Sequence, residues 1–232
     1  MPAIVTNRHV VEGAYEYRVI FSRSDENGNL LNINEQLTMR GSESDWIAHP
    51  DESVDLCVLP IGPALNGFIR AGKHLLTIPL SLELLPTDKQ IQDMGCMDEV
   101  TMVGYPNGIW DEANNLPIVR RGITATPYRY DYQGQKEFLV DMACYPGSSG
   151  SPVFLYHEGT YLENDAVVMG KRLYLLGILR AVPIRTLLGD ITVSTIAHVS
   201  VQDMLNLGIV IKSERLRDFD PIVRERLSVS GN

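Results

Sequence analysis

Residues 141–153 read DMACYPGSSGSPV, a glycine-bounded loop that leads into an apolar strand. Ser149 lies in a tight loop between Gly147 and Gly150. A nucleophilic serine needs an exposed hydroxyl on a turn, with backbone N–H groups directed to where an oxyanion forms. Gly147 can turn its own N–H into such a hole, in a conformation that residues with a Cβ atom resist. We therefore expect Ser149 to be a nucleophile, and Gly147 and Ser149 to form the oxyanion hole.

Two earlier segments hold residues that could activate Ser149. Residues 4–11 read IVTNRHVV, a short strand running into His9, and residues 49–59 read HPDESVDLCVL, with Asp55 at the head of an apolar strand. A serine hydroxyl is a poor nucleophile at neutral pH without an adjacent base. His9 would accept the proton of Ser149, and Asp55 would hold the imidazole tautomer and stabilise the imidazolium.

The order and spacing of these three residues support the same interpretation. The order His, Asp, Ser is that of the chymotrypsin triad and differs from the orders in subtilisin and the α/β-hydrolases. Asp55 follows His9 by 46 residues and Ser149 follows Asp55 by 94, against roughly 45 and 93 in the chymotrypsin template. Considered singly, each residue could have a structural role, as a structural histidine, an aspartate in a turn or a serine in a loop. Taken together they predict a catalytic triad.

The composition of the chain indicates which classes of molecule it could bind. The chain has 232 residues with 29 acidic and 20 basic side chains, a formal net charge of −9. Such a balance disfavours binding to nucleic acid or to an anionic membrane surface. No apolar stretch is long enough to span a bilayer, and the N-terminus does not read as a signal peptide. A protein or peptide substrate is the expected partner, and oligomerisation stays open.

The cysteines point to the cellular compartment. Cys57, Cys96 and Cys144 are odd in number, so they cannot all pair within the chain, and this usage favours a reducing, cytoplasmic location. Cys57 follows Asp55 on an apolar strand and is expected to be a buried, inert thiol. No Cys–His spacing reads as a metal cluster, so neither a metal nor another cofactor is expected. The other histidines do not lie in a motif with a possible catalytic or metal-binding partner. They are expected on the surface or in the core, and they are His49, His74, His157 and His198.

Short apolar runs separated by Pro- and Gly-rich gaps recur along the chain and favour an all-β barrel or sandwich. The expected strands are residues 3–6, 15–22, 55–59, 99–104, 118–126, 137–142, 151–156, 173–181 and 190–196. A capping box predicts a helix over 201–207 that ends at Gly208, and a second short helix is expected over 220–226. A Pro-rich connection over 75–98 separates two halves.

With these motifs, the sequence resembles the trypsin-like serine peptidases. Residues 141–152 are similar to the Asp-x-Ala-x-x-Pro-Gly-x-Ser-Gly-x-Pro loop of their HtrA/Deg branch, residues 6–11 to its Thr-Asn-x-His-Val segment, and residues 55–59 to its Asp-Leu-Ala-Val-Leu segment. The resemblance implies two six-stranded-type β-barrels and a serine endopeptidase, without the PDZ domain of that branch. It divides the chain into residues 1–85 with His and Asp, residues 86–208 with Ser and the specificity pocket, and a tail over 209–232.

The resemblance also implies substrate-binding residues. Ala143 falls at the base of the specificity pocket and Cys144 beside it, where Cys144 either tunes the pocket or is a passive wall residue. Gly177, Ile178, Leu179 and Arg180 fall on the strand that lines the substrate cleft. Because Ala143 is not acidic, a small or medium apolar side chain is expected at the cleaved position. Arg180 could instead favour an acidic group, or be a solvated strand end.

Three departures from the family pattern leave alternatives open. Ser148 replaces the acidic residue that binds the freed N-terminus in digestive proteases, and Ser151 replaces a loop glycine. Only eight residues precede His9, which suggests an incomplete first barrel, a gap filled by the segment after Gly208, or a start codon placed too late. The alternative functions are a binding module that keeps the fold without competent geometry, and an esterase or acyltransferase that uses the same triad.

Overall fold

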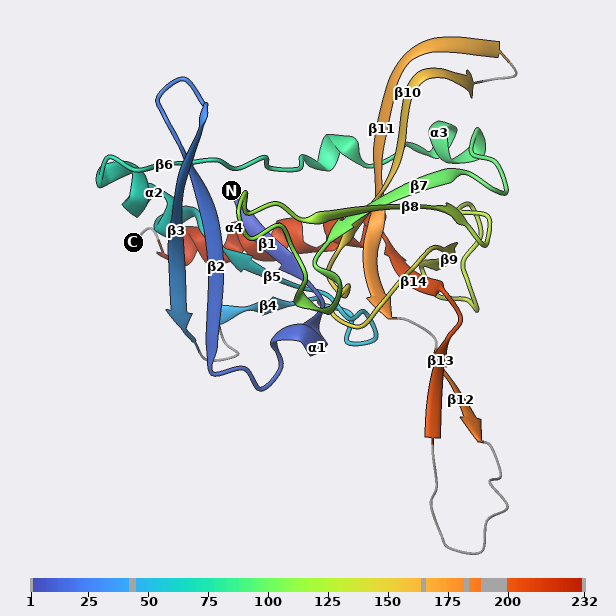
Figure 1. Ribbon diagram of the computed structural model, residues 1–232, viewed down its shortest axis with the longest axis horizontal. Helices are drawn as coiled ribbons and strands as arrows, with labels where there is room; N and C mark the ends of the chain where they lie inside the picture. The colour runs from blue at the N-terminus through green and yellow to red at the C-terminus, as the bar shows by residue number, and fades with distance from the viewer. Residues whose placement is uncertain (1, 42–44, 164–165, 182–183, 189–199, 231–232) are drawn as a thin grey trace, which may run out of the picture.

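The computed structural model describes residues 2–41, 45–163, 166–181, 184–188 and 200–230 (Figure 1). The chain is mostly β-sheet with a few short helices, which confirms the expected all-β class. The elements in chain order are β1 (Ala3–Thr6), α1 (Arg8–Val11), β2 (Glu16–Ser24), β3 (Leu30–Arg40), β4 (Ile47–Ala48), β5 (Cys57–Pro60), α2 (Gly62–Arg70), β6 (His74–Leu75), η2 (Leu82–Leu84), α3 (Asp88–Gln92), β7 (Glu99–Gly104), η3 (Pro106–Gly108), β8 (Ile118–Thr124), β9 (Glu137–Asp141), β10 (Pro152–Glu163), β11 (Ala166–Ala181), β12 (Ile184–Leu188), β13 (Ser200–Met204), β14 (Leu207–Lys212), η4 (Ser213–Asp218) and α4 (Phe219–Ser230).

The first half of the chain forms two three-stranded sheets. One has the strand order β1-β5-β4 and the other β3-β2-β6. β1 and β5 pair antiparallel in the register Thr6 with Cys57 and Ala3 with Pro60. This register matters for the site, because it brings the residues that follow β1 beside those that precede β5.

In the second half, six strands hydrogen-bond in a closed ring in the order β10-β11-β14-β9-β8-β7. Alternate residues of these strands point inward, as the two-residue period of a strand requires. Phe138 and Val140 of β9, and Val100 and Met102 of β7, are almost completely buried inside the ring. The hairpin of β10 and β11 continues beyond the ring, as Figure 1 shows.

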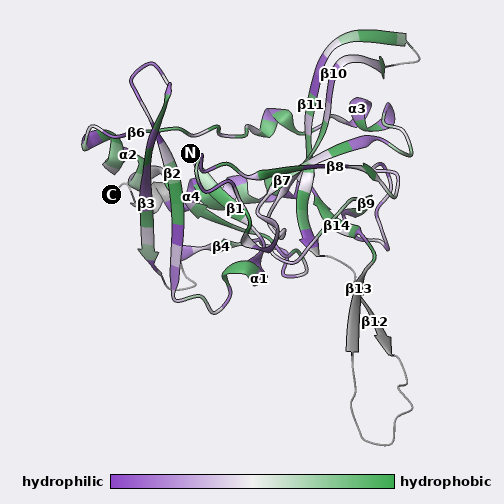
Figure 2. Cartoon of the chain, in the orientation of Figure 1, coloured by the Kyte–Doolittle hydropathy of each residue, from purple (hydrophilic) through white to green (hydrophobic). Residues whose placement is uncertain are grey.

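The two halves share a second hydrophobic core. Its members come from the first half, from the ring and from the C-terminal segment: Ile47, Val54, Leu56, Val58, Leu85, Phe154, Leu175, Ile178, Ile211, Leu216 and Phe219. Figure 2 shows hydrophobic residues along β1 and in part of β11. Burial of apolar area is the dominant favourable term in such packing, so this core holds the two halves together.

The C-terminal region corrects one expectation and confirms another. The helix expected over 201–207 is wrong, since β13 ends at Met204 and β14 begins at Leu207, with two connecting residues between them. β13 pairs with β12 and β14 with β9, and the ladder bonds override a capping signal that acts only locally. The helix expected over 220–226 is confirmed within α4. The strand expected over 190–196 lies outside the described residues.

Other expectations agree with the structure to within a few residues, apart from strands that prove longer. β10 and β11 both extend into the hairpin, past the runs expected at 151–156 and 173–181. The 75–98 connection holds only η2 and α3 between its expected ends. β3 and α2 were not expected. Within the described residues, none of the helices is long and apolar enough to cross a bilayer.

Candidate active site

His9 and Asp55 form a direct hydrogen-bonded pair. The Nδ1 atom of His9 lies 2.6 Å from Oδ2 of Asp55, and the main-chain N–H of His9 donates to Oδ1 at 3.1 Å. The side chain of Asp55 is 17% exposed and that of His9 is 47% exposed. A carboxylate on Nδ1 fixes the proton there, which leaves Nε2 as the acceptor on the exposed side of the ring.

The neighbouring chain segments position this pair. Asn7, the residue that precedes α1, is fully buried, and its Nδ2 donates to the main-chain carbonyl of Asp55 at 2.9 Å. Arg8 donates to the carbonyl of Glu52 at 3.1 Å. His9 therefore stands on a single helical turn just after β1, and Asp55 stands just before the strand that pairs with β1. Adjacent strands explain why residues 46 apart in sequence meet.

The loop that carries Ser149 consists of two successive tight turns. The N–H of Ser148 donates to the carbonyl of Tyr145 at 3.0 Å, and that of Ser151 donates to the carbonyl of Ser148 at 3.1 Å. Gly147 and Gly150, the third residues of these turns, have φ values of +82° and +84°. A positive φ at the third position defines a type II turn and favours glycine there. Ser149 thus occupies the second position of the second turn.

These turns leave two amides available for an oxyanion. Among the described residues, neither Gly147 nor Ser149 donates its N–H to a main-chain carbonyl. The carbonyl of Pro146 accepts a 2.8 Å hydrogen bond from the N–H of Asn107. Because a trans peptide directs its C=O and its N–H to opposite sides, this bond turns the N–H of Gly147 away from Asn107. Sequence reasoning missed Asn107, although the turn-forming triplet Pro106-Asn107-Gly108 was a signal.

A close contact joins the loop of Ser149 to the segment of His9. A Cβ atom added at Gly150 would lie 2.5 Å from Oγ1 of Thr6. The N–H of Gly150 donates to the carbonyl of Leu179 at 2.9 Å, and the N–H of Leu179 donates to Ser151 at the same distance. The serine loop is therefore held between β1 and β11.

The hydroxyl of Ser149 donates to the main-chain carbonyl of Arg180 at 3.2 Å. Between the described residues His9 and Ser149 there is no hydrogen bond. Hydrogen bonds of catalytic groups are often long or poorly aligned without substrate and tighten in the complex. The structure thus joins His9 to Asp55 directly, and joins Ser149 to the same region through the contact of its loop with Thr6.

The side chains of several expected substrate-binding residues point into the protein. Cys144 and Leu179 are fully buried in the core of the ring, and Ile178 is buried in the core shared by the two halves. Burial raises the pKa of the Cys144 thiol to about 11, which favours a passive wall residue. Gly177 is packed so tightly that a Cβ atom would lie 2.0 Å from the carbonyl oxygen of Ile211. The side chains of Cys144, Ile178 and Leu179 therefore do not face solvent.

Ala143 and Arg180 are the expected substrate-binding residues that stay accessible. Ala143 is exposed, and its carbonyl accepts a hydrogen bond from Arg120, whose guanidinium lies 4.7 Å from the centre of the Tyr145 ring. Arg180 is paired with Glu137, with Nε 2.9 Å from Oε1. The side chain of Arg180 is 34% exposed and that of Glu137 is 13% exposed, so the carboxylate of Glu137 offsets the charge of a partly exposed Arg180.

Within the parts of the chain that the structure describes, no group of three or more His, Cys, Asp or Glu side chains could hold a metal ion. All three cysteines carry free thiols; Cys57 and Cys144 are buried and Cys96 is exposed.

Comparison with known proteins gave one family. Residues 3–162 match the protein family described as Trypsin-like peptidase domain. The match covers more than half of the chain and includes His9, Asp55 and Ser149. No curated protein matches the chain.

Proposed function

Because the chain belongs to the trypsin-like peptidase domain family, we propose that it is a serine endopeptidase with His9, Asp55 and Ser149 as its catalytic triad. The observation that carries this proposal is the 2.6 Å contact between Nδ1 of His9 and Oδ2 of Asp55. In the neutral imidazole this contact holds the ring proton on Nδ1 and leaves Nε2 as the acceptor that a general base needs. The order His, Asp, Ser along the chain, which is that of the chymotrypsin triad, also supports the proposal.

In the proposed reaction, Ser149 attacks the carbonyl carbon of the scissile peptide bond while His9 takes the hydroxyl proton at Nε2. The imidazolium that forms is stabilised by the carboxylate of Asp55. Negative charge develops on the carbonyl oxygen, where the N–H groups of Gly147 and Ser149 would donate to it. His9 then gives its proton to the leaving amine, and water hydrolyses the acyl-enzyme by the same steps in reverse.

The substrate class follows from the residues around Ser149. Ala143 offers no negative charge at the base of the expected pocket, and the charge of Arg180 is offset by Glu137. Both observations favour a small or medium apolar side chain at the cleaved position over a basic or acidic one. By motif the chain resembles the HtrA/Deg peptidases, and in this proposal the residues around Ser149 select the substrate.

A mixture of internally quenched peptides that vary at the cleaved position tests this proposal. We expect cleavage after small or medium apolar residues and loss of all cleavage in Ser149→Ala, with an unchanged melting temperature. Cleavage that persists in Ser149→Ala would contradict the role of Ser149. Cleavage restricted to basic positions would contradict the pocket.

A second candidate is a binding module that keeps the fold without turnover. It is favoured by the hydrogen bond from Ser149 to the carbonyl of Arg180, since this bond directs the hydroxyl to an acceptor other than His9. The two candidates differ in reactivity, because a fluorophosphonate phosphonylates only a serine that a base has activated. An ester substrate measured beside the peptides separates the peptidase from an esterase or acyltransferase.

A further inference from the structure

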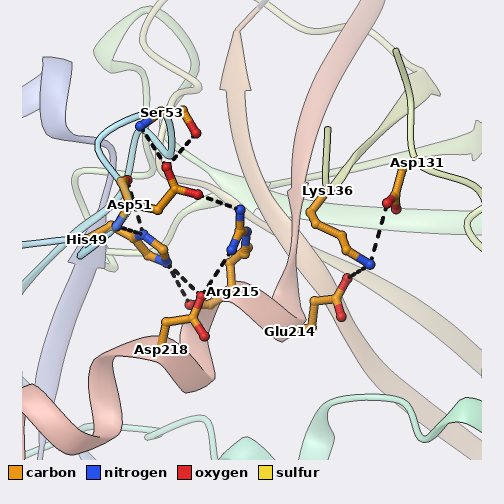
Figure 3. A network of polar contacts seen from close by, with 8 residues as sticks. All are labelled: His49, Asp51, Ser53, Asp131, Lys136, Glu214, Arg215 and Asp218. Carbon is orange, nitrogen blue, oxygen red and sulfur yellow. Dashed lines mark hydrogen bonds and ion pairs between the residues drawn. The ribbon is translucent and has the colours of Figure 1, made fainter. Parts of the chain in front are cut away.

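Three segments far apart in sequence meet in one polar network, drawn in Figure 3. The first is the loop of residues 49–54, which leads directly to Asp55. The second is η4 in the C-terminal segment. The third is the hairpin loop of residues 131–136 between β8 and β9. The first loop belongs to the half that carries His9 and Asp55, and the hairpin loop belongs to the half that carries Ser149.

His49 is the buried centre of the contact between the first loop and η4. Its side chain has no exposed surface. The main-chain N–H of Asp51 donates to Nδ1 of His49 at 3.0 Å, so Nε2 carries the ring proton. Nε2 lies 3.1 Å from Oδ2 of Asp218 and 3.2 Å from the carbonyl of Arg215. Phe219 packs edge-on against the ring at 5.2 Å.

Two consecutive charged residues of η4 pair with opposite halves of the protein. Arg215 lies 2.8 Å from the carboxylate of Asp51 in the first half. Glu214 lies 3.3 Å from the amine of Lys136 in the second half. Hydrogen bonds from the side chain and amide of Ser53, with the charge of Arg215 nearby, hold the pKa of Asp51 below its usual value. Asp51 is therefore ionised at neutral pH.

The loop of residues 49–54, which pairs with Arg215 through Asp51, is short and closed by its own main-chain hydrogen bonds. A displacement of Asp51 would therefore also displace Asp55. The N–H of His49 donates to the carbonyl of Leu56 at 3.0 Å, and that of Val54 donates to the carbonyl of Asp51 at 3.0 Å. Asp55 lies inside this closed loop. A shift of η4 would consequently move Asp55, and His9 with it, relative to the ring that carries Ser149.

On the basis of the peptidase function proposed above, we propose that η4 is a brace between the two halves, in which Glu214 and Arg215 act as positioning residues for catalysis. Neither residue contacts the triad. Their side chains are 49% and 25% exposed, and partly exposed ion pairs add little to folding stability. Catalysis is more sensitive, because a misplacement of about 1 Å costs on the order of a hundredfold in rate.

The test exchanges the order of the two charges in the double variant Glu214→Lys with Arg215→Glu. This variant keeps composition and net charge but sets like charges against Lys136 and Asp51. The matched control exchanges a neighbouring exposed pair on α4, Asp220→Arg with Arg224→Asp, whose two side chains face each other at 2.9 Å. Turnover of a quenched peptide is normalised to the concentration of active sites, below the melting temperature of each protein.

We expect the exchange variant to lose roughly tenfold or more in kcat with KM within about twofold, and the control to stay within about twofold of wild type in both. A second set uses Glu214→Lys alone and together with Lys136→Glu, because restored pairing should recover most of a lost kcat. A merely structural role would lower the melting temperature and the fraction of active sites without changing kcat per site.

A folded exchange variant that keeps the wild-type kcat would overturn the brace, as would a Glu214→Lys loss that Lys136→Glu does not recover. If the wild-type protein itself cleaves no peptide and forms no fluorophosphonate adduct, the proposed peptidase function fails and the brace fails with it. Wild-type turnover with an unaffected exchange variant contradicts only the brace.

Discussion

Thr6 and Gly150 touch across the two halves of the protein, so closely that a Cβ atom at Gly150 would lie 2.5 Å from the Thr6 hydroxyl oxygen. Thr6 lies three residues before His9, and Gly150 directly follows Ser149. This contact therefore links the segment of the proposed base to the loop of the proposed nucleophile.

The variant Gly150→Ala tests that link. We expect at least a hundredfold loss of kcat/KM, because the methyl group would push the serine loop from Thr6 and misplacement of about 1 Å costs about that much. The φ of +84° adds strain of roughly 1–2 kcal/mol for a residue with a Cβ atom. Gly170→Ala is the matched control, since nothing lies within 4 Å of a Cβ atom there. Equal activity of the two variants would contradict the importance of this contact.

Asn107 is predicted to set the oxyanion hole through its main chain. Its φ of +51° is disfavoured for β-branched residues, so Asn107→Val should shift the N–H that binds Pro146 and lower kcat by roughly ten- to a hundredfold. Asn107→Gly keeps the conformation and should retain most activity. Gln133→Val places the same strain, at a φ of +52°, in another loop and serves as the control. Asn107→Gly as inactive as Asn107→Val would point to the side chain instead.

Asp55→Asn should leave the fold intact and reduce kcat by roughly 10⁴-fold, the size of the effect in the serine-peptidase template. An amide at this position no longer selects the Nδ1–H tautomer of His9, so Nε2 ceases to be a base. Steady-state kinetics and the melting temperature of Asp55→Asn are compared with those of Asp220→Asn on the exposed face of α4. Activity of Asp55→Asn within tenfold of wild type would remove Asp55 from the triad.

The cysteines are predicted to react unequally with an alkylating reagent. Burial raises the pKa of Cys57 to about 12 and that of Cys144 to about 11, and the thiolate is the reactive form. At pH 8 iodoacetamide should therefore modify only the exposed Cys96 and leave peptidase activity unchanged. Peptide mass spectrometry gives the site of modification. Rapid alkylation of Cys144 in the folded protein would show that its side chain is open to solvent.

The parts of the fold that sequence predicted best are those where a local pattern and the final packing agree. β7 begins and ends at the expected residues 99 and 104, because its inward positions alternate with outward ones along the whole strand. The pairing of His9 with Asp55 was expected from the order and spacing of the two residues and from the family resemblance. The structure gives its physical reason, because His9 follows β1, Asp55 precedes β5, and these two strands pair.

The segment over 201–207 was misassigned as a helix for a physical reason. Ser200 and Asp203 have the spacing of a capping box, but the hydrogen bonds to β12 and β9 are long-range and leave no local mark in sequence. The sequence analysis also did not identify Asn107 and Arg215, because their partners are distant in sequence. Asn107 acts through its backbone on a residue 39 positions later, and Arg215 acts on Asp51, so neither forms a motif with its partner.

Phosphonylation of Ser149 by a fluorophosphonate is the sharpest test of the proposed triad. The native protein is incubated with the probe, digested, and searched by mass spectrometry for the adduct. We predict one adduct per chain, on Ser149, and a rate of labelling at least a thousandfold lower in His9→Ala. A wild-type protein that gains no adduct, or a His9→Ala variant labelled as fast as wild type, would contradict the triad.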